Sequence, residues 1–263
     1  MTNALVAPGE SQFSIARSLS MTFGVLGRNF VPMMLIAVIV TAIQGAIEYV
    51  LSGGDVTGGE GSGNSFLNII SYGFITAPVT YATFQDLRGT RIGVSEMMSG
   101  GFKKIGRVMG AAFAVGIVAV VAVLPAVFLY FASAFAGVAA GLAAAVFLLY
   151  IFVIWFALVP VQVMEDSKFF AGFGRAADLS RGRRWGILGL LLVYLVIIVA
   201  VSVVVFGIVA VVAVTAPIVG LILMIPFLAL YSAIGAIMPA VVYYLLRTEK
   251  EGVGIDEIAK VFD

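Results

Sequence analysis

Residues 185–246 have the sequence WGILGLLLVYLVIIVAVSVVVFGIVAVVAVTAPIVGLILMIPFLALYSAIGAIMPAVVYYLL, which contains no charged side chain. A helix needs about 20 residues to cross the roughly 30 Å hydrocarbon layer of a bilayer, so this stretch can cross twice. Residues 108–164 form a second charge-free stretch of similar length. Continuously apolar sequence favours helices over the alternating pattern of a membrane barrel. The two stretches therefore predict an all-α, polytopic integral membrane protein.

The composition supports this class and argues against catalysis. The chain has 263 residues, of which 62% are hydrophobic and 11% charged, whereas about 25% of the residues of soluble domains are charged. It has no Cys and no His, so thiol chemistry is excluded and the commonest general base and metal ligand are missing. We expect no enzyme activity, no cofactor and no metal. The net charge of +1 gives no reason to expect a nucleic-acid partner.

Hydropathy predicts one membrane domain with six transmembrane helices, arranged as three hairpins. Amphipathic segments precede the hairpins, and we expect them to lie at the membrane interface. After the last span, residues 247–263 form a tail that carries a short apolar stripe. The predicted spans are residues 30–51, 65–85, 108–131, 137–162, 185–212 and 218–246, and the predicted interfacial helices are 13–28, 94–107 and 166–180.

The distribution of basic residues predicts the orientation of these spans. With six spans, all 15 Lys and Arg residues fall on the side that holds both termini, and an odd number of spans would break this separation. The positive-inside rule makes that side cytoplasmic. We therefore expect both the N-terminus and the C-terminus in the cytoplasm.

A dipeptide recurs in front of each predicted hairpin. Gly-Arg occurs at residues 27–28, 106–107 and 182–183, each time at or near the end of an amphipathic segment. One interpretation is three tandem units, each made of an interfacial helix and two spans. The other is that any helix starting on the cytoplasmic side favours a basic residue there.

Polar residues follow one face of each of the first two predicted spans. We call the following set the polar seam: Thr41, Gln44 and Glu48 in the first span, and Asn68, Tyr72, Thr76 and Thr80 in the second. Polar groups inside a membrane usually face the protein interior, so the seam could line a solvated path or a head-group site. The alternative is hydrogen bonding between the helices, worth about 0.6–2 kcal/mol per contact.

Basic residues beside the amphipathic segments are candidate contacts for anionic lipids. Such residues attract anionic head groups by about 1 kcal/mol each, although topology alone also requires positive charge there. In addition, Gly137 and Gly141 form a GxxxG pair that allows close helix packing, within the fold or between copies in a homo-oligomer. The candidate lipid contacts are Lys103, Lys104, Arg107, Arg181, Arg183 and Arg184.

One segment resembles a known family. In VPVQVMEDSKFFAGFGRAADLSRGRRWGI, residues 159–187, a Pro precedes a Glu, and a Leu-x-x-Gly-x-x-Trp pattern leads into the next span. This segment resembles the membrane domain of the bacterial glycerophosphoryl diester phosphodiesterase membrane-domain family, in its stand-alone six-span form. The positions that carry the resemblance are Pro160, Glu165, Leu179, Gly182 and Trp185.

The resemblance implies a bacterial inner-membrane protein with a link to lipid or envelope metabolism. The family's catalytic domain uses His, which this chain lacks, so the resemblance does not imply the activity in the family's name. We expect a non-catalytic inner-membrane protein whose cytoplasmic face engages membrane lipids or a partner complex. The alternative hypothesis is a small transporter or channel that uses the polar seam.

Overall fold

The computed structural model describes residues 13–53, 65–165 and 168–252, and within these ranges all regular secondary structure is helical. The predicted all-α class is confirmed. In chain order the helices are α1 (Ile15–Arg28), α2 (Phe30–Leu51), α3 (Ser65–Leu87), α4 (Val94–Phe102), α5 (Ile105–Ala132), α6 (Ala134–Ile154), α7 (Leu158–Met164), α8 (Ala171–Ser180), α9 (Arg184–Thr215) and α10 (Pro217–Glu251).

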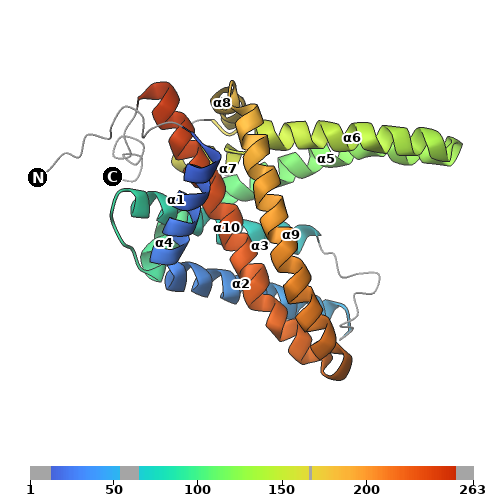
Figure 1. Cartoon of the computed structure of the whole chain (residues 1–263), viewed down its shortest axis with the longest axis horizontal. Coiled ribbons are helices and arrows are strands. Elements are labelled where there is room, and N and C mark those ends of the chain that lie inside the picture. Colours follow the sequence, from blue (N-terminus) through green and yellow to red (C-terminus); the bar gives the residue numbers. More distant parts are fainter. Residues whose placement is uncertain (1–12, 54–64, 166–167, 253–263) are drawn as a thin grey trace, which may run out of the picture.

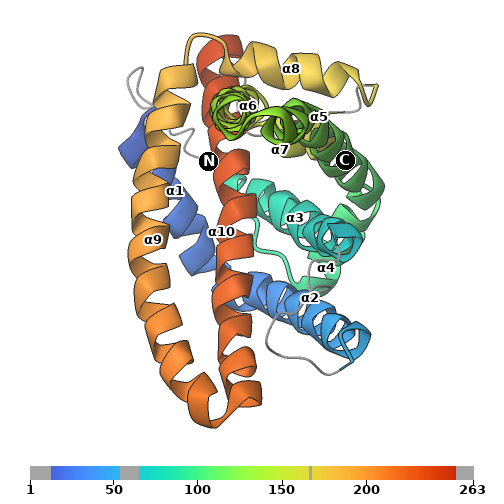
Figure 2. The same cartoon turned by 90° about the vertical axis from the view of Figure 1, so that its right-hand side faces the viewer.

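Helix α10 is the centre of the described structure. It packs against α3, α2, α9 and α1, and its buried Ile237 and Val241 join a core cluster with Met33 of α2 and Ile187 of α9. By contrast, α5 and α6 pack mainly against each other, and Figure 1 shows this pair projecting away from the rest. Figure 2 shows α5 and α6 nearly end-on while α9 and α10 run past them at a steep angle.

Five of the described helical segments are long and apolar enough to cross a membrane. They fit an integral membrane protein. Of the six predicted spans, α3 is the one missing from this set, because its Asn68, Thr76 and Thr80 lower its apolar character. The middle of α3 is buried, since α10, α4, α5 and α2 surround it. The five segments are 30–51, 105–132, 134–164, 184–215 and 217–251.

Two predicted helices are interrupted in the structure. The predicted interfacial helix at 94–107 is two helices, because α4 ends at Phe102 and α5 begins at Ile105. The predicted span at 137–162 stops at Ile154, and α7 follows after a short turn. The cause is Pro160 in the first turn of α7, since proline has no N–H to continue the ladder to the carbonyl of Phe156.

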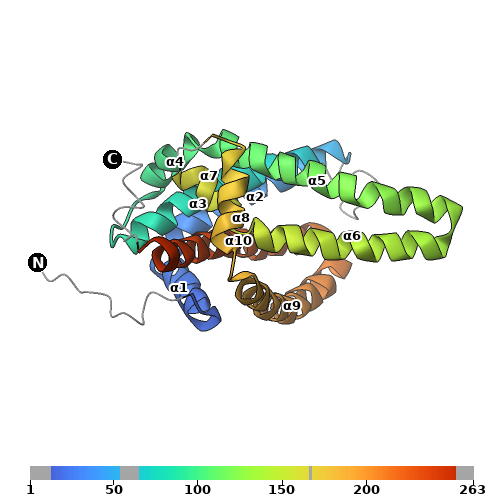
Figure 3. The same cartoon turned by 90° about the horizontal axis from the view of Figure 1, so that it is seen from above.

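The segments predicted as interfacial helices pack against the long helices of the structure. Helix α1 contacts α10 and α9, and it buries Ser18, Thr22 and Val25. The hydroxyls of Ser18 and Thr22 donate to carbonyls one turn earlier in the same helix, at 2.8 and 2.7 Å, so neither needs a partner on α10. Phe23, on the same helix, is exposed. Figure 3 shows α1, α4 and the C-terminal end of α10 at the same end of the molecule.

The third amphipathic segment is shorter than predicted. Helix α8 covers only Ala171–Ser180 of the predicted 166–180, and residues 166–167 lie outside the described ranges. The apolar stripe predicted in the tail also lies outside them.

The three Gly-Arg dipeptides differ in backbone conformation but share a contact. Gly182 has φ +84°, which favours glycine, whereas Gly27 and Gly106 are helical. Each arginine contacts an acidic residue that lies 58 to 66 positions later in the chain. The pairs are Arg28 with the carboxylate of Asp86, Arg107 with the backbone carbonyl of Glu165, and Arg183 with the carboxylate of Glu249. Because Arg107 meets a backbone carbonyl and the other two arginines meet carboxylates, both interpretations of the dipeptide stay open.

The GxxxG pair acts inside the α5–α6 hairpin. A Cβ atom added to Gly137 would lie 2.5 Å from Cα of Tyr130, and one added to Gly141 would lie 4.0 Å from Cβ of Ala126. Both neighbours belong to α5. This pair is therefore used within the fold, and it gives no support for a homo-oligomer.

Candidate functional site

The polar seam forms partly as the sequence predicts. Gln44 on α2 donates from Nε2 to Oε1 of Glu48 at 3.0 Å and to Oδ1 of Asn68 on α3 at 2.8 Å. Asn68 is exposed, and the other two side chains are half-buried. The structure therefore brings together two amides and one carboxylate near the ends of α2 and α3 that flank residues 54–64.

The other half of the seam is closed by packing only in part, since Tyr72 is 43% exposed. Tyr72 and Thr76 share a side-chain hydrogen bond one turn apart on α3. Thr76 and Thr80 are buried, and the hydroxyl of Thr80 has no hydrogen-bond partner within the described ranges. Thr41 is half-buried on α2. Gln44, Glu48 and Asn68 thus lie beside the buried hydroxyls of Thr76 and Thr80. This arrangement fits hydrogen bonding between the helices as well as it fits a solvated path.

Three of the candidate lipid-binding arginines bind groups of the protein itself. Arg183 donates from Nε to Oε1 of Glu249 at 2.8 Å. Arg184 donates to the hydroxyl of Tyr150 at 3.1 Å, and Arg107 donates to the carbonyl of Glu165 at 3.3 Å. These arginines hold helices together, which leaves fewer of their donors for lipid.

The remaining three candidates lie at the surface in two places. Lys103 is exposed and Lys104 half-buried at the junction of α4 and α5. Arg181 is exposed after α8, and its backbone carbonyl accepts a hydrogen bond from Nζ of Lys250 at 2.6 Å. The sequence prediction of lipid contact stays open for these residues.

A cluster of charged and hydrogen-bonding side chains joins α7, α8 and α10. Glu165 accepts from Nε of Arg175 at 3.1 Å and from the hydroxyl of Tyr243 at 2.9 Å. Arg247 donates to the same hydroxyl at 2.8 Å and to Oε2 of Glu251 at 2.9 Å, and Glu251 also pairs with Arg175. Burial lowers the pKa of Arg175, but hydrogen bonds to Glu165 and Glu251 hold it above its ordinary value, so it stays charged.

Sequence reasoning missed most of this cluster. Its members lie far apart in the chain, and Tyr243 in particular belongs to a long apolar run. The structure buries Tyr243 and places its ring edge-on to that of Phe84, with 5.7 Å between the ring centroids. Only Glu165 was singled out beforehand, through the family resemblance. Of the other positions that carry the resemblance, Leu179 is buried and Trp185 is exposed.

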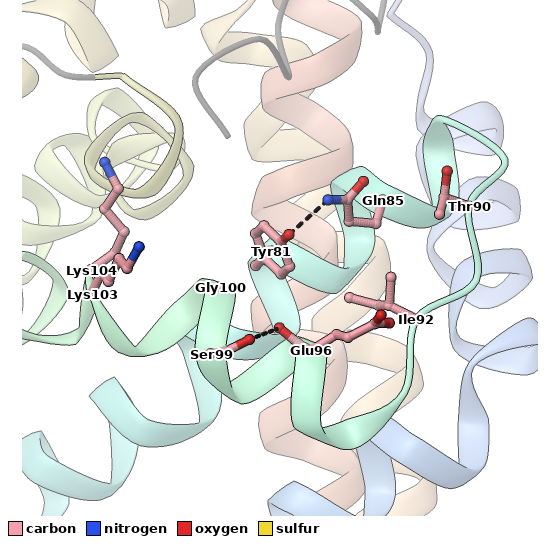
Figure 4. Close-up of a pocket in the computed structure, with 9 residues that line it drawn as sticks. All are labelled: Tyr81, Gln85, Thr90, Ile92, Glu96, Ser99, Gly100, Lys103 and Lys104. Atoms are coloured by element: carbon pink, nitrogen blue, oxygen red, sulfur yellow. Dashed lines mark hydrogen bonds between the residues drawn. The ribbon is translucent and has the colours of Figure 1, made fainter. Parts of the chain in front are cut away.

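A polar hollow of about 600 Å³ lies between α3, α4 and the loop that joins them (Figure 4). Figure 4 shows the two lysines at one end and Thr90 and Ile92 at the other, with Tyr81 between them. Two hydrogen bonds shape its wall. Nε2 of Gln85 donates to the hydroxyl of Tyr81 at 2.8 Å, and the backbone N–H of Gly93 donates to Glu96 at 3.2 Å. The lining includes Tyr81, Gln85, Glu96, Ser99, Lys103 and Lys104.

The fold and these sites define an all-helical membrane protein. No family model matches the chain, and no curated protein or solved structure matches it either. Any function must therefore be inferred from the residues of this chain.

Proposed function

We propose that the chain crosses the membrane six times, with α2 and α3 forming the first of three hairpins. The contact between Arg28 and Asp86 supports this, because Arg28 lies just before α2 and Asp86 lies in the last turn of α3. The chain therefore leaves one end of the molecule along α2 and returns to that end along α3. If α2 crosses the membrane, α3 must cross back. Burial of its polar face inside the bundle explains how a less apolar helix can do so.

The same contacts support a single basic face. Arg107 reaches Glu165, Arg175 reaches Glu251, and the backbone N–H of Phe13 donates to Glu249, which also binds Arg183. Residues from the N-terminal segment, from the segments around Arg107 and Arg175, and from the end of α10 thus meet at one end. By the positive-inside rule that end faces the cytoplasm of a bacterial inner membrane.

We infer that the protein is non-catalytic and engages membrane lipids, or a partner membrane complex, through this basic face. The observation that carries the inference is the convergence of the basic segments at one end of the molecule, with Lys103 and Arg181 exposed. Basic residues placed at a membrane surface attract anionic head groups. The family resemblance, with its link to lipid or envelope metabolism, points in the same direction.

Native mass spectrometry of the protein, released gently from its own membrane, tests this function. We expect either one retained lipid class or a partner protein in fixed stoichiometry. A bare protein that carries only bulk lipid in proportion to its abundance would contradict the proposal.

The second candidate function is a small transporter or channel, favoured by the trio of Gln44, Glu48 and Asn68. Glu48 accepts a hydrogen bond from Gln44 on its own helix, and Gln44 in turn bonds Asn68 on the neighbouring helix. A carboxylate in such a polar group offers an entrance for a cation or a proton. In reconstituted vesicles, Gln44→Leu, Glu48→Ala and Asn68→Leu should then each abolish an ion or proton flux. Single-cysteine scanning that finds positions 44, 48 and 68 inaccessible to water-soluble reagents would exclude this candidate.

A further inference from the structure

Arg184 is a half-buried arginine that no acidic side chain of the described residues neutralises. Nη1 donates to the neutral hydroxyl of Tyr150 at 3.1 Å, and the guanidinium carbon lies 5.5 Å from the centroid of the same ring. Nε is buried and has no hydrogen-bond acceptor in the described part of the chain. The neighbouring Arg183, by contrast, is paired with Glu249. Arg184 is therefore a cation that the described structure leaves without a counter-ion.

The place of Arg184 in the chain sets its depth in the membrane. It is the last charged residue before the charge-free run 185–246, and it begins α9. Tyr150 lies about one turn before the end of α6 at Ile154. In the proposed topology both of these helix ends lie on the basic, cytoplasmic side, where the lipid head groups of the inner leaflet lie. The guanidinium is therefore level with the head groups and not with the hydrocarbon layer.

The membrane side of this contact is apolar and exposed. Figure 1 shows α6 running with α5 away from the rest of the molecule, while α9 runs along α10. Val146, one turn from Tyr150 on α6, is 69% exposed, and Leu195, three turns from Arg184 on the same face of α9, is 54% exposed. Trp185 is 85% exposed, and tryptophan is enriched at membrane interfaces. A cation at head-group level beside apolar surface suits an amphiphile with an anionic head.

The chemistry of the guanidinium indicates which anionic head fits. Its planar N–H groups match the oxygens of a phosphate, and Nη2 of Arg184 donates to no group of the described residues. Its single positive charge equals the single negative charge of a phosphodiester. A zwitterionic head group adds an ammonium, which Arg184 would repel. These features favour an anionic glycerophospholipid over a zwitterionic one.

We propose that Arg184 binds the phosphodiester of one anionic glycerophospholipid of the cytoplasmic leaflet, whose acyl chains lie against α6 and α9 beside Val146 and Leu195. This proposal rests on the proposed function and names the lipid and its site. It commits to a lipid of the surrounding bilayer, of the phosphatidylglycerol type. A soluble phosphate is the competing occupant.

Trp185 allows the lipid next to Arg184 to be observed directly. The chain has two tryptophans, so Trp155→Phe leaves Trp185 as the single one. The full-length Trp155→Phe protein is reconstituted in vesicles with equal amounts of phosphatidylglycerol and phosphatidylethanolamine, one of which carries brominated acyl chains. Bromine quenches tryptophan fluorescence only at short range. Brominated phosphatidylglycerol should compete for the position beside Trp185 about five-fold better than brominated phosphatidylethanolamine, the effect of one basic residue on anionic lipid.

Three variants in this background test the role of the charge. Arg184→Gln should abolish the preference for phosphatidylglycerol. Arg91→Gln is the matched control, since Arg91 is exposed in the loop between α3 and α4, and it should keep the preference within about two-fold because diffuse attraction is screened by salt. Tyr150→Phe should keep it as well, because this variant removes the hydrogen bond between α6 and α9 but leaves the charge. It separates lipid binding from the role of Arg184 in joining the two helices.

Size-exclusion chromatography first shows which variants are monodisperse, and only these are scored. If Arg184→Gln is not among them, the comparison of the two lipids on the Trp155→Phe protein still tests the proposal. Inorganic phosphate should lower the preference no more than chloride of the same ionic strength does. A specific loss with phosphate would mean that the site takes a soluble anion, which would overturn the proposal.

Three further outcomes would overturn it. These are equal quenching by the two lipids, an unchanged preference in Arg184→Gln, and an equal loss of preference in Arg91→Gln or Tyr150→Phe. If native mass spectrometry shows a retained lipid class or partner but Trp185 shows no preference, this site is contradicted while the proposed function stands. A protein that retains only bulk lipid and shows no preference at Trp185 would contradict both.

Discussion

Arg28 and Asp86 form a two-pronged ion pair that joins the end of α1 to the end of α3. Nη2 of Arg28 lies 2.5 Å from Oδ2 of Asp86, and Nε lies 3.2 Å from Oδ1. The side chain of Asp86 is only 3% exposed, and Nδ2 of Asn29 also donates to it at 2.7 Å. A carboxylate so far from solvent needs these hydrogen bonds to offset its lost hydration.

Removal of the Arg28 partner should therefore destabilise the protein. We expect Arg28→Gln to lower the free energy of unfolding by roughly 2–3 kcal/mol, less than a fully buried pair because Arg28 is half exposed and Asn29 still donates. Thermal unfolding in detergent measures this. Arg17→Gln, which removes the same charge from the same helix, should have an effect below about 0.5 kcal/mol. Equal shifts in the two variants would contradict a specific role for the pair.

A second prediction follows from the close approach of α4 to α3. Gly101→Ala should lower stability by about 1–3 kcal/mol, because its new Cβ has no room beside the backbone of Pro78. Gly116→Ala on α5 is the matched control, since nothing lies within 4 Å of its Cβ position. That control should be neutral or stabilising by up to about 1 kcal/mol. The thermal unfolding midpoints of both variants test this prediction. Equal midpoints for Gly101→Ala and Gly116→Ala would contradict it.

The hydroxyl of Tyr243 should contribute to the cluster around Glu165. Tyr243→Phe keeps the ring against Phe84 but removes one hydrogen bond to Glu165 and one from Arg247, and should cost about 1–3 kcal/mol. Tyr244→Phe is the control, because this neighbouring hydroxyl has no such bond within the described ranges. If both variants melt together with the wild type, the cluster contributes nothing to stability.

The six-span topology can be tested with single cysteines, since the chain has no Cys of its own. A membrane-impermeant maleimide should label Thr57→Cys and Ser133→Cys in cells whose inner membrane is intact. Ser95→Cys should react only after that membrane is opened. Labelling of positions 57 and 95 under the same condition would mean that α3 does not cross.

The tail provides a prediction about partners. Its predicted apolar stripe, Ile255, Ile258, Ala259 and Phe262, lies outside the described ranges. Deletion of residues 254–263 should reduce association with a lipid or partner while membrane insertion is retained, because the stripe would be the contact surface. Co-purification before and after the deletion measures this, and an unchanged result would remove the tail from the proposal.

Much of the helix layout follows from local sequence. Residues 30–51 were predicted and α2 has the same bounds, and the predicted spans at 108–131, 185–212 and 218–246 differ from α5, α9 and α10 by a few residues at each end. Long apolar runs leave no alternative to helices in lipid, and this constraint is local. The break at Ile154 was also encoded locally, by Pro160, although hydropathy alone did not detect it.

The candidate sites depended on contacts that no local pattern encodes. Arg183 and Arg184 looked like free lipid-binding charges, but Glu249 and Tyr150, far along the chain, bind them. Tyr243 belongs to a long apolar run, yet the structure gives its hydroxyl two polar partners, Glu165 and Arg247, and packs its ring against Phe84 of α3. Such pairings depend on which helix faces meet, and the apolar faces of these helices are nearly uniform in sequence.

By itself, the sequence determined the class of protein, the helices and the segregation of basic residues. The reason is that in lipid each apolar segment must satisfy its own backbone hydrogen bonds, whatever its neighbours are. Only the tertiary structure decided that Arg28 meets Asp86, that Gly137 packs within its own hairpin, and that Lys103 and Lys104 end a polar recess beside α3. The physical reason is that charge pairing and close backbone approach are properties of helix surfaces in contact. Those surfaces are brought together only when the hairpins pack around α10.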